Sequence, residues 1–220
     1  MSLKLYLARH GRTVFNVMRR IQGWCDSPLT DEGRAVAAAL GASLGDTVQF
    51  DAAYASTSPR AIDTARLILR AKGQGSLPIG TLSDLREFYF GGLEGELIDT
   101  VYEQSAAFHG ISDLQHWLHR HRHGSRNLLI QSTHALDPLG LAETEQCFIE
   151  RIQRGLDTVV QQSRPGGTVL LVSHGMAIST ILKKIAPDTA LRKSIRNATP
   201  VHLSYRDGRW SILDREIPYD

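Results

Sequence analysis

Short apolar runs alternate with longer amphipathic stretches along the chain. Residues 3–8 form one such run, which ends directly at charged residues, and residues 168–174 form a second run of the same kind. Uninterrupted apolar runs of this length are typical of strands that are buried on both faces, as in parallel sheets covered by helices. We therefore predict a buried strand at each of these two positions.

Helical patterns follow the predicted strands. Thr30 is suited to an N-cap because two acidic residues come directly after it. Val36, Leu40 and Leu44 then recur every four residues along one face, which predicts an amphipathic helix. Residues 51–57 form another apolar run, and this strand leads into a second helix.

The remaining elements continue the same alternation. A weaker third strand covers residues 78–87, and a long helical pattern covers residues 143–162. After a turn and the strand at 168–174 comes a helix over residues 175–185. Residues 201–213 carry a hairpin signature around Asp-Gly.

This order of elements predicts one α/β domain over residues 1–220, a three-layer α/β/α sandwich with a mostly parallel central sheet and an antiparallel edge. Residues 97–140 lack a clear pattern, and we interpret them as an insertion at one end of the sheet. Long irregular segments in compact domains are usually functional. A lid over a site is the role we expect.

Composition excludes several classes of protein. The formal net charge of +2 gives no reason to expect nucleic acid binding. The sequence shows no apolar run of about 18 residues and no secretory signal pattern, so we expect a cytoplasmic protein without a membrane partner. Cys25 and Cys147 stand far apart without metal-ligand spacing, and we expect neither a disulfide nor a zinc site.

Charged and titratable residues follow the predicted strands, each at a strand's carboxyl end. In open α/β sheets these ends meet at one edge, where ligands bind. The residues in question are Arg9, His10, Arg60, Glu87 and His174. We expect them to converge on one site.

This set of residue types fits a phosphate group. A cation in the first helical turn, such as Arg60, opposes the helix dipole by about 0.3–1 kcal/mol unless an anion lies there. Arginines and helix N-termini together bind dianions. Either His10 or His174 is able to act as a nucleophile toward phosphorus, and a protonated Glu87 is able to supply the proton that a departing alkoxide needs.

The motifs that hold these residues resemble those of the histidine phosphatase superfamily, in its phosphoglycerate-mutase-like branch. They are "LARHGRTVFN", "QGWCDSPLTDEG", "STSPRAIDTA", "LREFYFGGLEG" and "VLLVSHG". The resemblance implies that His10 becomes a phosphohistidine without a metal cofactor, and that Glu87 is the proton donor. It also implies that Arg9, Arg60 and His174 hold the phosphoryl group. The other residues implied to line phosphate and substrate are Asn16, Gln22, Gly23, Gly175 and Met176.

The resemblance leaves the reaction open between transfer and hydrolysis. Cofactor-dependent mutases of this family place a Tyr and a Lys where this chain has Phe90 and Ile98. They also carry an adjacent Arg pair in the insertion, where this chain has only the separated Arg120, Arg122 and Arg126. We therefore expect a phosphatase acting on a small phosphorylated substrate. A phosphoglycerate-type mutase and a non-catalytic phospholigand-binding module remain the alternatives.

The cluster "HWLHRHRHG" at residues 116–124 lies inside the insertion. We interpret it as a solvated basic face of the lid, since no single conformation brings its histidines into one ligand set. The alternatives are that Arg120, Arg122 and the histidines attract an anionic substrate, or that the cluster binds metals adventitiously. The terminal hairpin presents a strand edge that would allow a homodimer.

Overall fold

A six-stranded sheet forms the centre of the computed structural model, which describes residues 1–220. The strand order is β3-β2-β4-β1-β5-β6. The first four strands of this order are parallel to one another, and β5 is antiparallel to both of its neighbours, β1 and β6. The strands are β1 (Ser2–Arg9), β2 (Ala52–Ser56), β3 (Ile79–Leu82), β4 (Thr168–Ser173), β5 (Pro200–Arg206) and β6 (Arg209–Ile212). The mostly parallel sheet with an antiparallel edge is confirmed.

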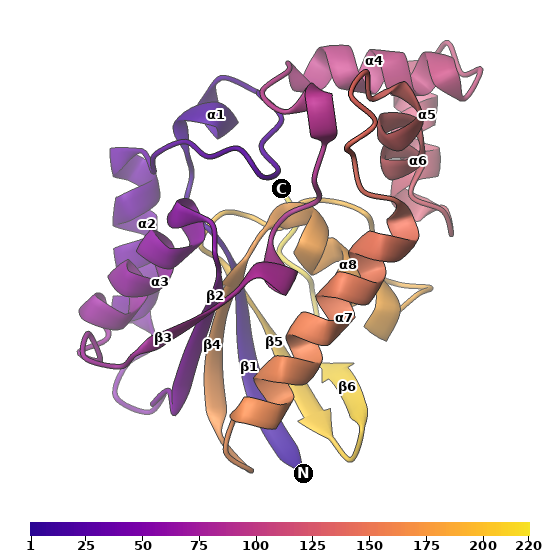
Figure 1. The fold of residues 1–220 in the computed structure, drawn as a ribbon. Coiled ribbons are helices and arrows are strands. Elements are labelled where there is room, and N and C mark those ends of the chain that lie inside the picture. Colours follow the sequence, from indigo (N-terminus) through magenta and orange to yellow (C-terminus); the bar gives the residue numbers. More distant parts are fainter.

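Helices cover both faces of this sheet, as Figure 1 shows. On one face α2 (Asp31–Ser43) and α3 (Pro59–Ala71) enclose a smaller apolar core that includes Leu170 and Val172 of β4. On the other face α7 (Glu145–Gln162) and α8 (Gly175–Ile185) enclose a larger core that includes the alternate residues of β4. Strand side chains alternate between the faces, so one apolar strand supplies both cores. The three-layer α/β/α arrangement is therefore confirmed.

The helix at residues 31–43 forms, and Leu40 and Leu44 of the predicted apolar face are partly buried against the core, but the expectation for Val36 is wrong. Val36 is 41% exposed, whereas the buried positions are Gly33, Ala37 and Gly41. A Cβ at Gly41 would lie 2.2 Å from the Ile68 carbonyl oxygen of α3. The two helix backbones approach too closely for larger side chains, so the smallest residues face the interior.

The third predicted strand is shorter than expected. β3 ends at Leu82, and a 3₁₀ turn, η1 (Ser83–Leu85), carries the chain toward Glu87. The terminal hairpin forms as predicted, with β5 and β6 joined through Asp207 and Gly208. Both turn residues have positive φ, at 49° and 85°. This is the backbone conformation that favours Asp-Gly in a two-residue hairpin turn.

Residues 97–140 contain three helices beyond the carboxyl end of the sheet (Figure 1). They are α4 (Ile98–Phe108), α5 (Leu114–His123) and α6 (Leu128–Leu136). His116, His119, Arg120 and His123 are exposed, as expected for a solvated basic face, whereas Trp117 is fully buried and His121 is 8% exposed. The rings of these two residues stack at 5.2 Å with a 3° interplanar angle. None of the helices combines the length and the apolar composition that a membrane crossing requires.

Candidate active site

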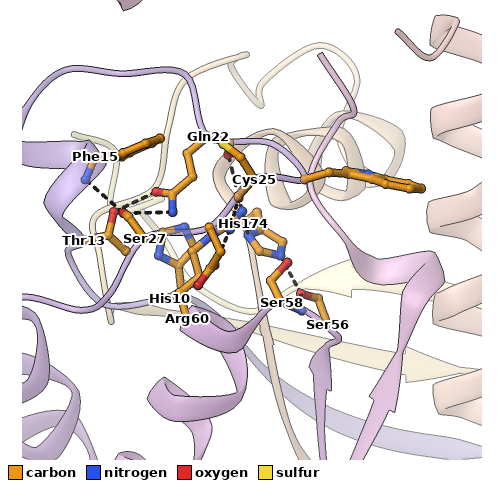
Figure 2. A network of polar contacts seen from close by, with 12 residues as sticks. His10, Thr13, Phe15, Gln22, Cys25, Ser27, Ser56, Ser58, Arg60 and His174 are labelled. Atoms are coloured by element: carbon orange, nitrogen blue, oxygen red, sulfur yellow. Dashed lines mark hydrogen bonds and ion pairs between the residues drawn. The ribbon is translucent and has the colours of Figure 1, made fainter. Parts of the chain in front are cut away.

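His10 and His174 lie side by side because β1 and β4 are adjacent parallel strands. Arg9 of β1 pairs in register with Ser173 of β4, and each histidine is the next residue along its strand's path. The centroids of the two imidazole rings are 5.2 Å apart. Figure 2 shows both rings beside the Arg60 side chain, which extends from the start of α3.

The hydrogen bonds of His10 determine which of its nitrogens is free. Its Nδ1 lies 2.8 Å from the carbonyl oxygen of Gly11. A carbonyl only accepts, so Nδ1 carries the proton and Nε2 keeps its lone pair. Burial, and then the nearby Arg60 and Arg9, hold the pKa of His10 well below its usual value of 6.5. The ring is therefore neutral, with Nε2 available as a nucleophile.

Both ring nitrogens of His174 are already engaged. Arg60 Nη2 lies 3.1 Å from Nδ1, and because a guanidinium only donates, Nδ1 must accept. The proton then resides on Nε2, which donates to Ser56 Oγ at 2.6 Å (Figure 2). Burial and the charge of Arg60 hold the pKa of His174 well below its usual value. Of the two histidines left open by the sequence, only His10 presents a free nitrogen.

Arg60 is fully enclosed and held by the loop at residues 22–26. Its Nη1 donates to Asp26 Oδ1 at 2.7 Å, and its Nη2 donates to the Gly23 carbonyl oxygen at 2.7 Å. The anion expected next to Arg60 at the start of α3 is therefore the Asp26 carboxylate of the protein itself. Arg60 Nε is buried without a protein partner.

Arg9 shows the same division between engaged and free nitrogens. Its Nη1 donates to the Ile195 carbonyl oxygen at 2.9 Å and to Asp220 Oδ2 at 2.8 Å. Its Nε is buried without a protein partner, and a Cβ added at Gly175 would lie 3.7 Å from it. An unpaired buried donor costs about 1–3 kcal/mol. Oxygen atoms of a phosphoryl group at the start of α8 would satisfy this donor, whereas Arg60 does not itself line the cavity.

Glu87 lies against the first turn of α8. Its carboxylate accepts from the backbone amides of Met176 at 2.9 Å and Ala177 at 3.1 Å. Burial raises the pKa of Glu87, although hydrogen bonds from the Met176 and Phe88 amides and the charges of Arg60 and Arg9 oppose the increase. The Met176 amide is therefore used by Glu87, which leaves the Gly175 amide as the free donor of this helix start.

The other predicted ligands occupy different parts of the site. Asn16 and Gln22 line the cavity, and the amide of Gln22 donates to Ser27 Oγ at 3.1 Å. Gly23 does not line the cavity, since its amide donates to Glu94 Oε2 and its carbonyl holds Arg60. A Cβ at Gly23 would lie 2.1 Å from the Phe88 carbonyl oxygen. Gly23 thus allows the Arg60 loop to pack on the Glu87 loop.

Sequence reasoning missed several residues that support the site. Arg151 of α7 donates to the carbonyl oxygens of Arg86 at 2.9 Å and Glu87 at 3.1 Å, and pairs with Glu143 at 2.7 Å. It fixes the loop that presents the Glu87 carboxyl. An arginine on the apolar face of the helix beside Phe148 is the signal that points to it. Ser56 and Asp26 also escaped notice, although Ser56 stands at the end of a predicted strand.

The cavity above these groups has a volume of about 140 Å³. The insertion forms part of its wall through Ile98, Tyr102, His121, Asn127 and Leu129. Cationic side chains also line it, namely Arg9, Arg20, Arg192 and Lys193, with Glu87 as the one acidic residue. No group of three or more potential metal ligands is clustered in the structure.

We expect Arg60→Ala to weaken both the fold and anion binding. The substitution leaves Asp26 without its cation, and breaking a buried pair costs about 3–5 kcal/mol, the lower end applying because the Asp26 side chain is 27% exposed. Urea unfolding measures the free energy of unfolding, and vanadate binding should weaken at least tenfold. Arg66→Ala, which removes an exposed arginine of the same helix, is the control and should change neither. Unchanged vanadate affinity in Arg60→Ala would show that Arg60 acts only in folding.

Comparisons with known proteins identify the family of this chain. A family model described as the histidine phosphatase superfamily (branch 1) matches residues 5–217. A 2,3-bisphosphoglycerate-dependent phosphoglycerate mutase 2 from Gloeobacter violaceus is 30% identical over 211 residues, covering 94% of this chain and 88% of that protein.

Two solved structures extend the likeness to three dimensions. A phosphoglycerate mutase from Bacillus anthracis str. Sterne is 33% identical with a TM-score of 0.86, covering 96% of this chain and 91% of that one. Bacillus stearothermophilus YhfR is 29% identical with a TM-score of 0.75, covering 97% of this chain and 96% of that one. By sequence, fold and site geometry, the chain belongs to the histidine phosphatase superfamily.

Proposed function

We propose that the protein is a phosphatase that hydrolyses a small phosphomonoester through a phosphohistidine on His10. The observation that carries this proposal is the free, unprotonated Nε2 of His10 beside two arginines whose Nε groups lack partners. This arrangement combines a nucleophile with donors for the phosphoryl oxygens. The His10 imidazole is uncharged, because burial holds its pKa well below the usual value.

The reaction follows from the positions of these groups. His10 Nε2 attacks phosphorus, the bond between phosphorus and the ester oxygen breaks, and Glu87 gives its proton to the departing oxygen. Arg9, Arg60 and the Gly175 amide carry the charge of the transferred group. A water molecule then takes the phosphoryl group from His10 and gives a proton back to the Glu87 carboxylate, which restores the starting state.

The cavity wall favours water as the final acceptor. Phe90 and Ile98 line the cavity where the family's mutases have a Tyr and a Lys. None of Arg120, Arg122 and Arg126 lines it. A second phosphate group would therefore find apolar surface at two places where those mutases hold it. Weak retention of a bisphosphorylated ligand leaves the phosphohistidine open to hydrolysis.

A phosphoglycerate-type mutase is the second candidate. It is favoured by the names of the Gloeobacter relative and the Bacillus anthracis structure, both described as phosphoglycerate mutases. Arg20, Arg192 and Lys193 also give the cavity a positive charge that suits an acidic substrate. The two candidates differ in whether the phosphoryl group leaves the enzyme on water or on a second ester.

We expect the purified protein to release inorganic phosphate from phosphomonoesters in excess chelator, with no requirement for 2,3-bisphosphoglycerate. The measurement is a panel of sugar phosphates, nucleotides, phosphoglycerates and p-nitrophenyl phosphate, run with and without added divalent metal. A parallel coupled assay follows interconversion of the phosphoglycerates. Interconversion that depends on the bisphosphate and exceeds phosphate release would establish the mutase instead. Failure to turn over even the aryl phosphate would leave a binding module.

A further inference from the structure

The side of the cavity formed by the insertion carries polar atoms that have no partner in the protein. His121 of α5 is 8% exposed, and its Nδ1 is buried without a hydrogen bond. Buried polar atoms in native proteins are nearly always paired with protein, water or ligand. His121 lines the same cavity as His10, so a ligand that fills this cavity lies against the His121 side chain.

His121 is held in one orientation and in one charge state. Its ring stacks flat on Trp117, which is itself fully buried. Burial, together with the charges of Arg192 and Arg122, lowers the pKa of His121 to about 3. A neutral imidazole offers one N–H donor and one acceptor, which suits an uncharged hydrogen-bonding group.

Two neighbours on the insertion add polar groups to this wall, although neither contributes a buried atom without a partner as His121 does. The Tyr102 ring packs against Trp117 with centroids 5.4 Å apart. Asn127 uses its Oδ1 to accept from the Ile130 amide at 3.2 Å, which leaves its side-chain NH₂ unpaired. Both residues line the cavity with His121, and the apolar side chains of Ile98 and Leu129 line it beside them. This wall is neutral, polar at three points and apolar elsewhere.

The cations of the same cavity are partly engaged by backbone. Arg20 Nη1 donates to the Gly95 carbonyl oxygen at 2.7 Å, and Arg192 donates to the carbonyl oxygens of Gly124 and Ser125. Lys193 is the one lysine that lines the cavity, and it has no ion pair in the protein. The insertion wall is therefore better matched to hydroxyl groups than to a second anion.

We propose that Tyr102, His121 and Asn127 form a leaving-group subsite that selects a small hydroxylated alcohol. This inference rests on the proposed function, since it assigns the alcohol portion of the phosphomonoester. A hydroxyl both donates and accepts, so it satisfies an imidazole nitrogen, a phenol or an amide in turn. The methylene groups between the hydroxyls pack on Ile98 and Leu129. The phosphoryl group and the alcohol would share this cavity, whose volume is about 140 Å³.

Three phosphonates test the subsite without turnover, because their carbon–phosphorus bond is not hydrolysed by this chemistry. They are propylphosphonate, 2,3-dihydroxypropylphosphonate and 2-carboxyethylphosphonate. We expect the native protein to bind the dihydroxy compound about tenfold more tightly than the propyl compound, as two or so added hydrogen bonds would give. His121→Phe preserves an aromatic ring against Trp117. In this variant the dihydroxy compound should bind only about one- to threefold more tightly than the propyl compound. His121→Gln restores a hydrogen-bonding group and should recover part of the ratio.

A matched control keeps the result interpretable. His116→Phe introduces the same side chain at an exposed position of α5 and should leave the ratio at its native value. A ratio near one in the native protein, or a native ratio retained in His121→Phe, would overturn the subsite. So would tightest binding of the carboxylate compound in both proteins, which would assign selection to Lys193 and Arg20. If the native protein shows the ratio but hydrolyses no phosphomonoester, the subsite stands and the proposed reaction fails.

Discussion

The His10→Ala variant should show no measurable turnover of any phosphomonoester. Of the two adjacent histidines His10 and His174, only His10 has a ring nitrogen free to attack phosphorus, since both nitrogens of His174 are engaged. Rapid quench with labelled substrate should trap an acid-labile, alkali-stable phosphoenzyme in the native protein and none in the variant. Loss of a covalent nucleophile removes the pathway itself, so the decrease is expected to exceed about 10⁴-fold.

A second histidine variant makes this result specific. His202 lies in β5 outside the cavity, and its Nδ1 is 2.7 Å from Asp214 Oδ1. His202→Ala should therefore still form the phosphoenzyme. Label found on His174 in the native protein would reverse the assignment. The free protein offers an independent check by NMR, because burial and the charge of Arg60 hold the pKa of His10 and of His174 well below 6.5. Neither imidazole should show the titration near pH 6.5 that an exposed histidine shows.

Replacement of Glu87 by Gln should reduce the rate far more on alkyl phosphates than on p-nitrophenyl phosphate. An alkoxide needs a proton as it departs, and general acid catalysis contributes about 10²- to 10⁴-fold, whereas p-nitrophenolate leaves without this help. The measured quantity is the rate of phosphoenzyme formation, so that slow dephosphorylation does not mask the step. Glu32→Gln, at an exposed position of α2, is the control and should leave both rates unchanged.

The pH dependence of the same variant provides a separate test. Burial raises the pKa of Glu87, so the carboxyl keeps its proton to higher pH than an exposed glutamate does. Activity on alkyl phosphates should fall as pH rises through that pKa, and Glu87→Gln should lack this alkaline limb. Equal losses on both substrates with an unchanged profile would mean that Glu87 only positions the start of α8, where it accepts from Met176 and Ala177.

The sequence was sufficient to predict the sheet and the convergence of the charged groups. Apolar runs such as β4 are buried on both faces, and the rule that parallel strands end at one edge brings His10, Glu87 and His174 together. The helix at residues 31–43 was correctly predicted, and Leu40 and Leu44 of its predicted face pack against the core, but Val36 does not. Apolar periodicity predicts that Val36 is buried, whereas the close approach of α2 to α3 allows only glycine and alanine at the contact. The distance between two helices cannot be read from the sequence of either helix alone.

The chemistry of the individual side chains depended on contacts that the sequence does not reveal. Arg60 was predicted to require an anion, but the structure was needed to show Asp26 in that place. The choice between His10 and His174 followed from single hydrogen bonds to Gly11 and Ser56. His121 belongs to a stretch whose charge suggested solvent exposure, and only the packing of three helices around Trp117 buries it.

The pairing of β1 with β4 also links catalysis to the course of folding. These neighbouring strands bring together Arg9 and Ser173, and most of the chain lies between them in sequence. Contacts between such distant segments carry a large loop-closure entropy and form slowly, so a partly folded chain has no complete phosphate cradle. A phosphorylated ligand therefore binds only the fully assembled sheet, and at saturating concentration it adds its binding energy to the free energy that holds the two ends of the chain together.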